Sequence, residues 1–420
     1  MLRRSWLLPL FAAIAACTTS QGMVETESPI RGAPSESAPA PREDSPATTE
    51  TAPQAHPLPA VPFHTQSRWI VDAKNERFKL ASTSWYGAES KDFVVAGLDR
   101  ATLASIAANV RTAGLNSVRL PWSNELVETN PVVAADRLAA NPALVGKTAL
   151  EIFDAVIDAL AFEGIVVILD NHVSRADWCC TEKDGNGLWF TDAYPESAWL
   201  ADWRTMAKRY ANVPAVVGAD LRNELRGMPD GRKPTWGGSD ATLDWRAAAK
   251  RGGDAVLAEN PKLLVMVEGL NYATDFSDAY GKPPLAFAVA NRLVWSVHDY
   301  AWFHPGLALG DDLKTDLGNK WGFLLAQDKP FTAPVWVGEF GIDHTAKGVG
   351  STWFKGFLRY LDDADIDWSY WALNGTQSTG ATRTLGAEES YGILDTTWTK
   401  PASADLNAAL TTEVSVCQSP

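Results

Sequence analysis

The sequence predicts a (β/α)8 barrel, and three observations support this prediction. Eight short apolar segments alternate with amphipathic, helix-like segments from Trp69 almost to the end of the 420 residues. Runs such as IVVIL and LLVMV are apolar on both faces, as the buried strands of a parallel sheet are. Polar side chains follow directly after most of these runs, where the reactive groups of a barrel lie. A doubly wound open sheet is the structural alternative.

The expected elements follow one another in the order that a barrel requires. The expected strands are residues 79–84, 117–120, 165–171, 216–221, 263–268, 293–297, 335–338 and 367–371. The amphipathic stretches between them that predict helices are residues 102–113, 148–163, 198–210, 242–259 and 352–363. A hairpin is expected ahead of the barrel, where residues 69–72 and 77–79 flank Asn75.

The N-terminus reads as a targeting segment. Arg3 and Arg4 precede an apolar stretch of 11 residues, 6–16, which is too short to cross a bilayer as a mature helix. The stretch ends in Ile-Ala-Ala-Cys, which resembles the lipobox of bacterial lipoproteins, so we expect a signal peptide over 1–16 and a lipidated Cys17. Such a protein is exported and anchored to the cell envelope, and Thr18 favours the outer membrane in a host that has one. A plain signal peptide is the alternative.

A linker is expected between the anchor and the folded domain. Residues 18–62 hold 27 Pro, Ser, Thr and Ala among 45 residues, and they include no aromatic side chain. Such a segment cannot bury enough apolar area to offset its chain entropy, and its prolines keep it extended. The expected organisation is therefore a signal peptide (1–16), a disordered linker (17–62) and one catalytic domain (63–420), which we expect to be a monomer.

Composition excludes two classes of protein. Hydrophobic residues make up 46% and charged residues 21% of the chain, which excludes a wholly disordered protein. The formal net charge of −14 argues against a nucleic-acid partner, because no positive field gathers phosphates. The 18 tryptophans suggest surfaces that stack on sugar rings, in addition to core filling.

Two carboxylates stand out among the polar residues at the expected strand ends. Glu224 and Glu339 each follow an apolar run directly, where a carboxylate is costly unless it has partners or a task. Two such groups facing each other across a barrel mouth suit glycosidic bond cleavage, in which one acid protonates the leaving oxygen and one carboxylate attacks the anomeric carbon.

The chain resembles glycoside hydrolase family 5, the cellulase family, over nearly the whole domain. The matching residues are Val118-Arg119, Asn171-His172, Asn223-Glu224, His298-Asp299-Tyr300, Gly338-Glu339-Phe340-Gly341 and Trp371. The resemblance implies that Glu224 is the general acid/base and Glu339 the nucleophile. It further implies that Arg119 and Tyr300 hydrogen-bond the nucleophile, and that Asn223 holds the sugar 2-hydroxyl. His172 and His298 would bind hydroxyls and tune the pair, and Trp371 would lie beneath the sugar.

The loop after the third strand supplies further candidates. Trp178 and Trp189 lie in this long loop and are expected to line additional sugar subsites, with packing of the loop as the equal alternative.

Of the cysteines other than Cys17, Cys179, Cys180 and Cys417 are the disulfide candidates. In an exported protein we expect Cys417 to pair with Cys179 or Cys180. No CxxC pair or HExxH motif occurs, so we expect neither a metal nor another cofactor.

The expected function is a retaining β-glycoside hydrolase that acts on β-linked oligo- or polysaccharide, and foremost an endo-β-1,4-glucanase. The enzymatic alternatives are a β-mannanase, a β-1,3 or mixed-linkage glucanase, and an exo-β-glucosidase. The alternative of another class is a non-catalytic polysaccharide-binding lipoprotein, which the presence of both Glu224 and Glu339 disfavours.

Overall fold

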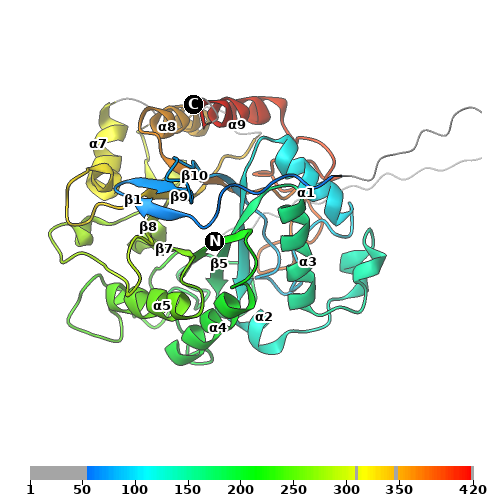
Figure 1. Cartoon of the computed structure of the whole chain (residues 1–420), viewed down its shortest axis with the longest axis horizontal. Helices are drawn as coiled ribbons and strands as arrows, with labels where there is room; N and C mark the ends of the chain where they lie inside the picture. Colours follow the sequence, from blue (N-terminus) through cyan, green and yellow to red (C-terminus); the bar gives the residue numbers. More distant parts are fainter. Residues whose placement is uncertain (1–53, 308–310, 345–348, 418–420) are drawn as a thin grey trace, which may run out of the picture. The chain divides into compact units, whose positions relative to one another are not determined.

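The computed structural model describes residues 54–307, 311–344 and 349–417. Eight parallel strands close into a barrel in the order β10-β3-β4-β5-β6-β7-β8-β9, with helices between successive strands (Figure 1). The strands are β3 (Ala81–Ser84), β4 (Ser117–Ser123), β5 (Val166–Val173), β6 (Val216–Asp220), β7 (Leu264–Glu268), β8 (Leu293–Asp299), β9 (Val335–Phe340) and β10 (Asp367–Tyr370). The predicted barrel is confirmed, and closure of the sheet excludes the doubly wound alternative.

The helices surround the barrel. The α-helices are α1 (Leu103–Thr112), α2 (Asn124–Thr129), α3 (Ala149–Phe162), α4 (Glu196–Arg209), α5 (Trp245–Glu259), α6 (Leu270–Ala273), α7 (Asp311–Lys320), α8 (Val349–Asp363) and α9 (Ala404–Cys417), and the 3-10 helices are η1 (Ala135–Leu138), η2 (Pro142–Leu144), η3 (Ser277–Ala279), η4 (Ala301–Phe303) and η5 (Gly322–Leu325). The five predicted helices correspond to α1, α3, α4, α5 and α8. Among the described residues, none of the helices is both long and apolar enough to cross a membrane.

A short hairpin closes the N-terminal end of the barrel. It consists of β1 (His64–Gln66) and β2 (Trp69–Val71), which pair antiparallel. The predicted pairing around Asn75 is present: an antiparallel bridge joins Val71 to Arg77, the Asp72 amide donates to the Glu76 carbonyl, and the Phe78 amide donates to the Ile70 carbonyl. The prediction missed β1, which pairs with the other edge of β2. Phe63 and Ile70, on this added part of the hairpin, bury their side chains against the barrel interior.

The predicted linker also ends too late. The His56 amide donates to the Phe162 carbonyl at 2.8 Å, and Leu58 and Val61 pack against the core at the base of the barrel. These two apolar side chains give residues 56–62 a packing surface that the Pro-rich composition concealed. Residues 1–53, which include Cys17, lie outside the described residues.

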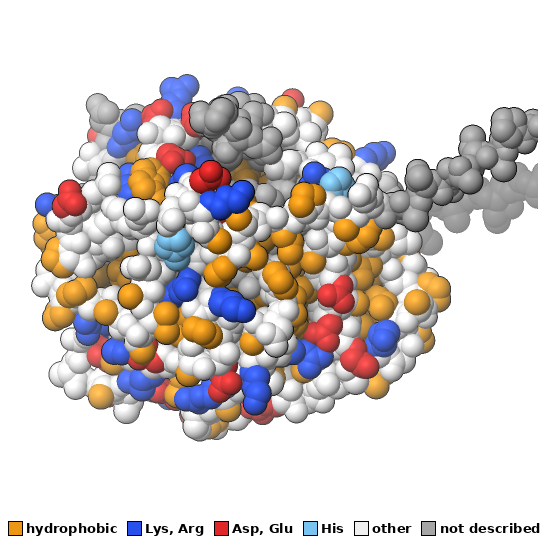
Figure 2. Space-filling model, viewed as in Figure 1, with side chains coloured by type: hydrophobic (Ala, Val, Ile, Leu, Met, Phe, Trp, Pro, Cys, Tyr) orange, Lys and Arg blue, Asp and Glu red, His pale blue; other side chains and the backbone are white. Residues whose placement is uncertain are grey.

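The barrel interior is apolar at one end and polar at the other. At the N-terminal end, Phe63, Ile70 and Leu80 pack against Val166, Ile168, Val217, Leu264, Met266, Val294 and Trp336. On the surface over this hairpin, acidic and basic side chains are interspersed with apolar ones (Figure 2). The polar side chains of the interior gather at the C-terminal ends of the strands, which is where the candidate site lies.

Candidate active site

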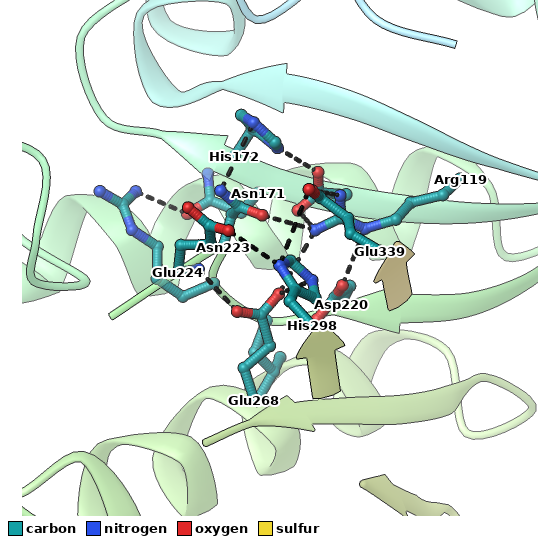
Figure 3. A network of polar contacts seen from close by, with 12 residues as sticks. Arg119, Asn171, His172, Asp220, Asn223, Glu224, Glu268, His298 and Glu339 are labelled. Carbon is teal, nitrogen blue, oxygen red and sulfur yellow. Dashed lines mark hydrogen bonds and ion pairs between the residues drawn. The ribbon is translucent and has the colours of Figure 1, made fainter. Parts of the chain in front are cut away.

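The barrel strands bring most of the predicted site residues together at one mouth (Figure 3). Arg119 lies on β4, His172 on β5, Glu268 on β7, His298 on β8 and Glu339 on β9. Asn223 and Glu224 follow β6, Tyr300 follows β8 and Trp371 follows β10. Because parallel strands end on the same side of the barrel, residues more than 200 positions apart in the sequence come into contact here.

A β-bulge aims Glu339 into the mouth. Val297 and His298 on β8 are opposite Val337 and Glu339 on β9, so Gly338 is an extra residue without a partner there. If side chains alternated strictly along β9, Glu339 would point the same way as Val337, whose side chain points out of the barrel and packs in the main hydrophobic core. A Cβ atom at Gly338 would lie 2.7 Å from the Ser296 hydroxyl, so the bulge needs a glycine at this close approach.

Two donors hold the carboxylate of Glu339. Arg119 Nη1 donates to Oε1 at 2.5 Å, and the Tyr300 hydroxyl donates to Oε2 at 3.1 Å. Burial raises the pKa of Glu339, while the positive charges of His298 and Arg119 oppose that rise. The paired contacts fix one carboxylate in a single orientation, as an attacking group requires.

Glu224 has a strained backbone. Its φ of 47° lies in the left-handed region, which costs a side-chain-bearing residue about 1–3 kcal/mol. Two contacts hold it there: its amide donates to Glu268 Oε2 at 2.6 Å, and Arg226 Nη1 donates to its carbonyl at 2.5 Å. Its side chain meets His298 Nδ1 at 3.2 Å. The strain directs this carboxyl group toward Glu339.

The two carboxylates are close. One oxygen of Glu224, one of Glu339 and a ring nitrogen of His298 all lie within 4.8 Å of one another. This separation belongs to enzymes in which the carboxylate attacks the sugar directly, since a mechanism that admits a water between the groups needs about 6.5–9.5 Å.

Arg119 is the centre of a buried charge network that the sequence analysis found only in part. Its guanidinium contacts Asp220 at 3.0 Å, Asp170 at 3.1 Å and Glu268 at 3.3 Å, in addition to Glu339. Burial raises the pKa of Asp170 and of Asp220 to about 6 and that of Glu268 to about 7, against the opposing charge of Arg119. The Arg119 guanidinium thus contacts several carboxyl groups at once. Burial keeps these groups partly protonated near neutral pH.

His172 and Asn223 form the side of the site next to this network. His172 Nδ1 lies 2.6 Å from Asp170, and its Nε2 lies 3.4 Å from Asn223 Nδ2. Burial, with the charge of Arg119, lowers the pKa of His172 to about 3, so the ring is neutral and Nε2 accepts. Asn223 Oδ1 accepts from Arg119 Nη2 at 2.8 Å, which fixes its amide with Nδ2 toward the cleft.

A cleft of about 490 Å³ surrounds these groups. Trp371 lines this cleft and stacks on the fully buried Tyr86 and on His172, at interplanar angles of 6° and 14°. Trp178 lines the same cleft, as predicted, with its ring centroid 6.1 Å from that of Trp371. Lining residues that the sequence analysis did not assign are Tyr272, Trp302, Phe303, Arg383, Glu389 and Tyr391.

Trp189 is a correction to the sequence analysis. Its side chain is fully buried, packs against Phe190 and Trp245, and donates its indole N–H to Glu196 at 2.9 Å. It therefore belongs to the core beneath the loop and not to the substrate cleft. Sequence alone did not separate it from Trp178, because both lie in one loop between β5 and α4.

The predicted disulfide pairing is also wrong. Cys179 and Cys180 are bonded to each other, across a cis peptide that leaves their Cα atoms 3.0 Å apart. The prediction assumed that adjacent cysteines do not close, and this assumption failed. Cys417 is the last residue of α9, and its side chain lies outside the described part of the chain.

Two groups of side chains in this network have the spacing of metal ligands. They are Asp220, Glu268 and His298, and Glu224, His298 and Glu339. In both groups His298 bridges carboxylates, and its own pKa is raised well above 6.5 because Glu268 and Glu339 outweigh the effect of burial. A protonated imidazole at this position offsets part of the negative charge of these carboxylates.

The chain is similar to known cellulases. The family model described as "Cellulase (glycosyl hydrolase family 5)" matches residues 67–377. An endoglucanase of Paenibacillus polymyxa is 32% identical over 85% of this chain and 89% of its own length. A glycosyl hydrolase 5 family protein of Chamaecyparis obtusa is 31% identical over 85% of this chain and 66% of its own.

A solved structure shares the fold. The catalytic domain of the major endoglucanase from Xanthomonas campestris superposes with a TM-score of 0.72 and 29% identity, covering 84% of this chain and 99% of that domain. The family model's match, residues 67–377, begins after β1 and includes all eight barrel strands together with Glu224 and Glu339.

Proposed function

Because the chain belongs to glycosyl hydrolase family 5, the cellulase family, we propose that it is an endo-acting β-1,4-glucanase that retains the anomeric configuration. The observation that supports this most directly is the approach of the Glu224 and Glu339 carboxylates within 4.8 Å. The chain is a glycosidase, and its relatives include the endoglucanase of Paenibacillus polymyxa.

The first chemical step joins the sugar to Glu339. The Glu339 oxygen attacks the anomeric carbon while Glu224 gives its proton to the glycosidic oxygen, so the C–O bond to the leaving sugar breaks and a glycosyl ester forms. The contacts of Arg119 and Tyr300 orient the attacking carboxylate.

The second step releases the sugar. Glu224, now ionised, removes a proton from a water molecule, whose oxygen attacks the same carbon and expels Glu339. His298 contacts Glu224 at 3.2 Å and Glu339 at 3.8 Å, so its positive charge accompanies the negative charge as it moves between the two groups.

The cleft suits a chain of sugars. Pyranose C–H faces are apolar and stack on the electron-rich faces of indole rings, for which Trp371 offers a floor. Further aromatic side chains, Trp302, Phe303 and Tyr272, continue the lining beyond Tyr300, on which Trp302 stacks at 4.3 Å. The cleft volume of about 490 Å³ lies in the usual range of ligand pockets.

Substrate choice is tested by comparing polysaccharides. The purified protein is incubated with β-1,4-glucan, mixed-linkage glucan, β-1,3-glucan, mannan, xylan and cello-oligosaccharides, and the products are separated by length. We expect fastest cleavage of β-1,4-glucan with internal cuts. Faster release of mannose chains, or of single glucose units from chain ends, would replace the proposal with a mannanase or an exo-β-glucosidase.

The catalytic roles are tested by two alanine variants and azide. Glu339→Ala abolishes turnover, and azide partly restores it with an α-azide product, because a small anion occupies the vacated site of the nucleophile. Glu224→Ala slows cleavage mainly for poor leaving groups, since an activated leaving group needs no acid. An α-anomer as the first product by NMR, or the same azide response in both variants, would refute the assignment.

We also propose that the protein is exported, anchored to the cell envelope through a lipidated Cys17, and monomeric. The support is the sequence pattern at the N-terminus, with an 11-residue apolar segment that ends at Cys17 and precedes a Pro-rich stretch.

A further inference from the structure

The Cys179–Cys180 disulfide lies in the wall of the substrate cleft. Both cysteines line the cavity that also contains Glu224, Glu339 and Trp371. Both are part-exposed, whereas most residues of the network behind them are fully buried. The disulfide therefore has a face toward any molecule that occupies the cleft.

The sulfur atoms border the amide of Asn223. Asn223 Nδ2 lies 3.4 Å from Cys180 Sγ and 3.7 Å from Cys179 Sγ, and 3.4 Å from His172 Nε2. Disulfide sulfur is a weak acceptor and the contact with the His172 nitrogen is long, so this N–H group has no strong partner among the residues that the structure describes. A hydroxyl of a sugar on Trp371 is a better acceptor, and an oxygen bound there lies next to both sulfurs.

The loop holds the disulfide in place from both sides. Before it, Asp177 pairs with Lys91 at 2.8 Å, and Arg383 stacks on Trp178 at 3.9 Å. After it, Arg226 donates to the Thr181 carbonyl at 3.1 Å. Because these contacts do not depend on the S–S bond, breaking that bond changes the wall locally and leaves the loop attached.

We propose that the Cys179–Cys180 disulfide contacts the sugar bound on Trp371 and contributes to its affinity. The proposal rests on the proposed function for the class of ligand, a β-linked glucan chain. The bonded sulfurs present a compact, polarisable surface to sugar C–H groups, beside the one polar donor that Asn223 supplies. Reduction replaces it with two mobile thiols.

Binding in two redox states tests the proposal without turnover. The Glu339→Gln variant is titrated with cellotetraose while tryptophan fluorescence is followed, first oxidised and then after dithiothreitol. One dithiol gives two electrons and two protons to the S–S bond, which yields two thiols and the cyclic disulfide of the reagent. We expect Kd to rise about fivefold to tenfold, which equals about 1–1.4 kcal/mol.

Kinetics on the active enzyme distinguish a direct contact between the disulfide and the sugar from a general structural role of the disulfide. Cys179→Ser/Cys180→Ser is expected to raise KM by the same factor, to keep kcat within about twofold, and to be insensitive to reductant. Cys417→Ser is the matched control and keeps the reductant response of the parent. Circular dichroism and the thermal midpoint show whether each variant is folded.

The outcomes distinguish this inference from the proposed function. The inference is wrong if cellotetraose binds equally well before and after reduction, with both thiols shown to be free by alkylation and mass spectrometry. This holds even when the enzyme cleaves β-1,4-glucan. Redox-dependent binding by an enzyme that cleaves no β-1,4-glucan overturns the proposed function and supports the inference. A loss of kcat equal to the rise in KM shows a structural role and also overturns the inference.

Discussion

His298 connects Glu224 and Glu339, the proposed catalytic pair, to a third acid. Its Nδ1 faces Glu224 at 3.2 Å and Glu339 at 3.8 Å, and its Nε2 faces Glu268 at 3.2 Å. Glu268 also accepts the Glu224 amide, so this one side chain positions both the backbone of Glu224 and the charge of His298. Glu268 is thus a positioning residue for the acid/base.

Glu268→Gln is expected to shift the pH profile. Burial lowers the pKa of His298, but the carboxylates of Glu268 and Glu339 outweigh burial and raise this pKa well above 6.5. Removing one of these charges lets the imidazolium lose its proton at lower pH. The alkaline limb of kcat/KM should therefore move to lower pH by about one unit, the usual effect of one neighbouring charge, with kcat reduced.

Glu128→Gln on the exposed side of α2 is the control for this shift, because it makes the same chemical change away from the site. A profile of Glu268→Gln that coincides with the wild type at both limbs would show that Glu268 only fills space.

The sequence reveals site residues by a carboxylate or histidine placed directly after an apolar run. Glu224 and Glu339 were found in this way. Glu268 follows LLVMV in the same manner but was not assigned, since the resemblance supplied no role for it. The pairing of Cys179 with Cys180, and the burial of Trp189, depend on the path of one loop, and local sequence does not encode that path.

At the scale of single elements, the bulge in β9 decides the orientation of Glu339, the proposed nucleophile. Gly338→Ala places a Cβ atom 2.7 Å from the Ser296 hydroxyl and 3.2 Å from His298 Nε2. We expect kcat/KM to fall by about tenfold to a hundredfold through displacement of His298 and Glu339, with about 1–3 kcal/mol lost from the free energy of unfolding. Activity assays and denaturant unfolding measure the two effects.

Gly318→Ala in α7 is the matched control, because nothing lies within 4 Å of its Cβ position and alanine favours a helix. It should keep wild-type kinetics. Unchanged kinetics in Gly338→Ala would contradict the role given to the bulge.

The contact between α2 and α4 is sensitive to pH. Asn124 donates to Asp202 at 2.7 Å, and burial raises the pKa of this carboxyl group from 3.8 to about 6. The folded protein therefore binds a proton more tightly than the unfolded chain. The stabilisation is present below pH 4 and is lost as the pH rises from about 4 to about 6.

Asp202→Asn removes this dependence and keeps an acceptor for Asn124. Relative to the wild type, the variant should gain about 1–2 kcal/mol of unfolding free energy between pH 4 and pH 7. Asp240→Asn is a control of opposite sign, because hydrogen bonds from Thr242 lower the pKa of Asp240. A constant difference between wild type and Asp202→Asn across this range would contradict the argument.

Elements were predictable where burial fixes the pattern. All eight barrel strands were found because each is buried on both faces and bounded by polar residues. Strand β1 and the end of the linker were not, because tertiary packing of Leu58, Val61 and Phe63 on the barrel base decides both. Helix α7 was missed because Leu313 and Leu317 are the only apolar residues on its core face.

At the scale of the whole molecule, the barrel separates stability from chemistry. The base is closed by apolar packing, while the mouth contains buried acids, a strained Glu224 and a cleft. A well-packed base allows the mouth to keep groups that would destabilise a smaller domain.

Anchoring through Cys17 is the last expectation, and the charge of the whole chain decides which force could supply it. A protein of formal net charge −14 gains no attraction from anionic lipid headgroups, so acyl chains on Cys17 must supply its membrane affinity, at about 0.8 kcal/mol per buried CH₂. We expect the wild type to remain with membranes in high salt and to leave them in detergent. Cys17→Ser should yield soluble or unprocessed protein with unchanged catalytic constants, whereas Cys417→Ser should fractionate like the wild type. Fully soluble wild-type protein with an N-terminus other than residue 17 would contradict the anchor and favour a plain signal peptide.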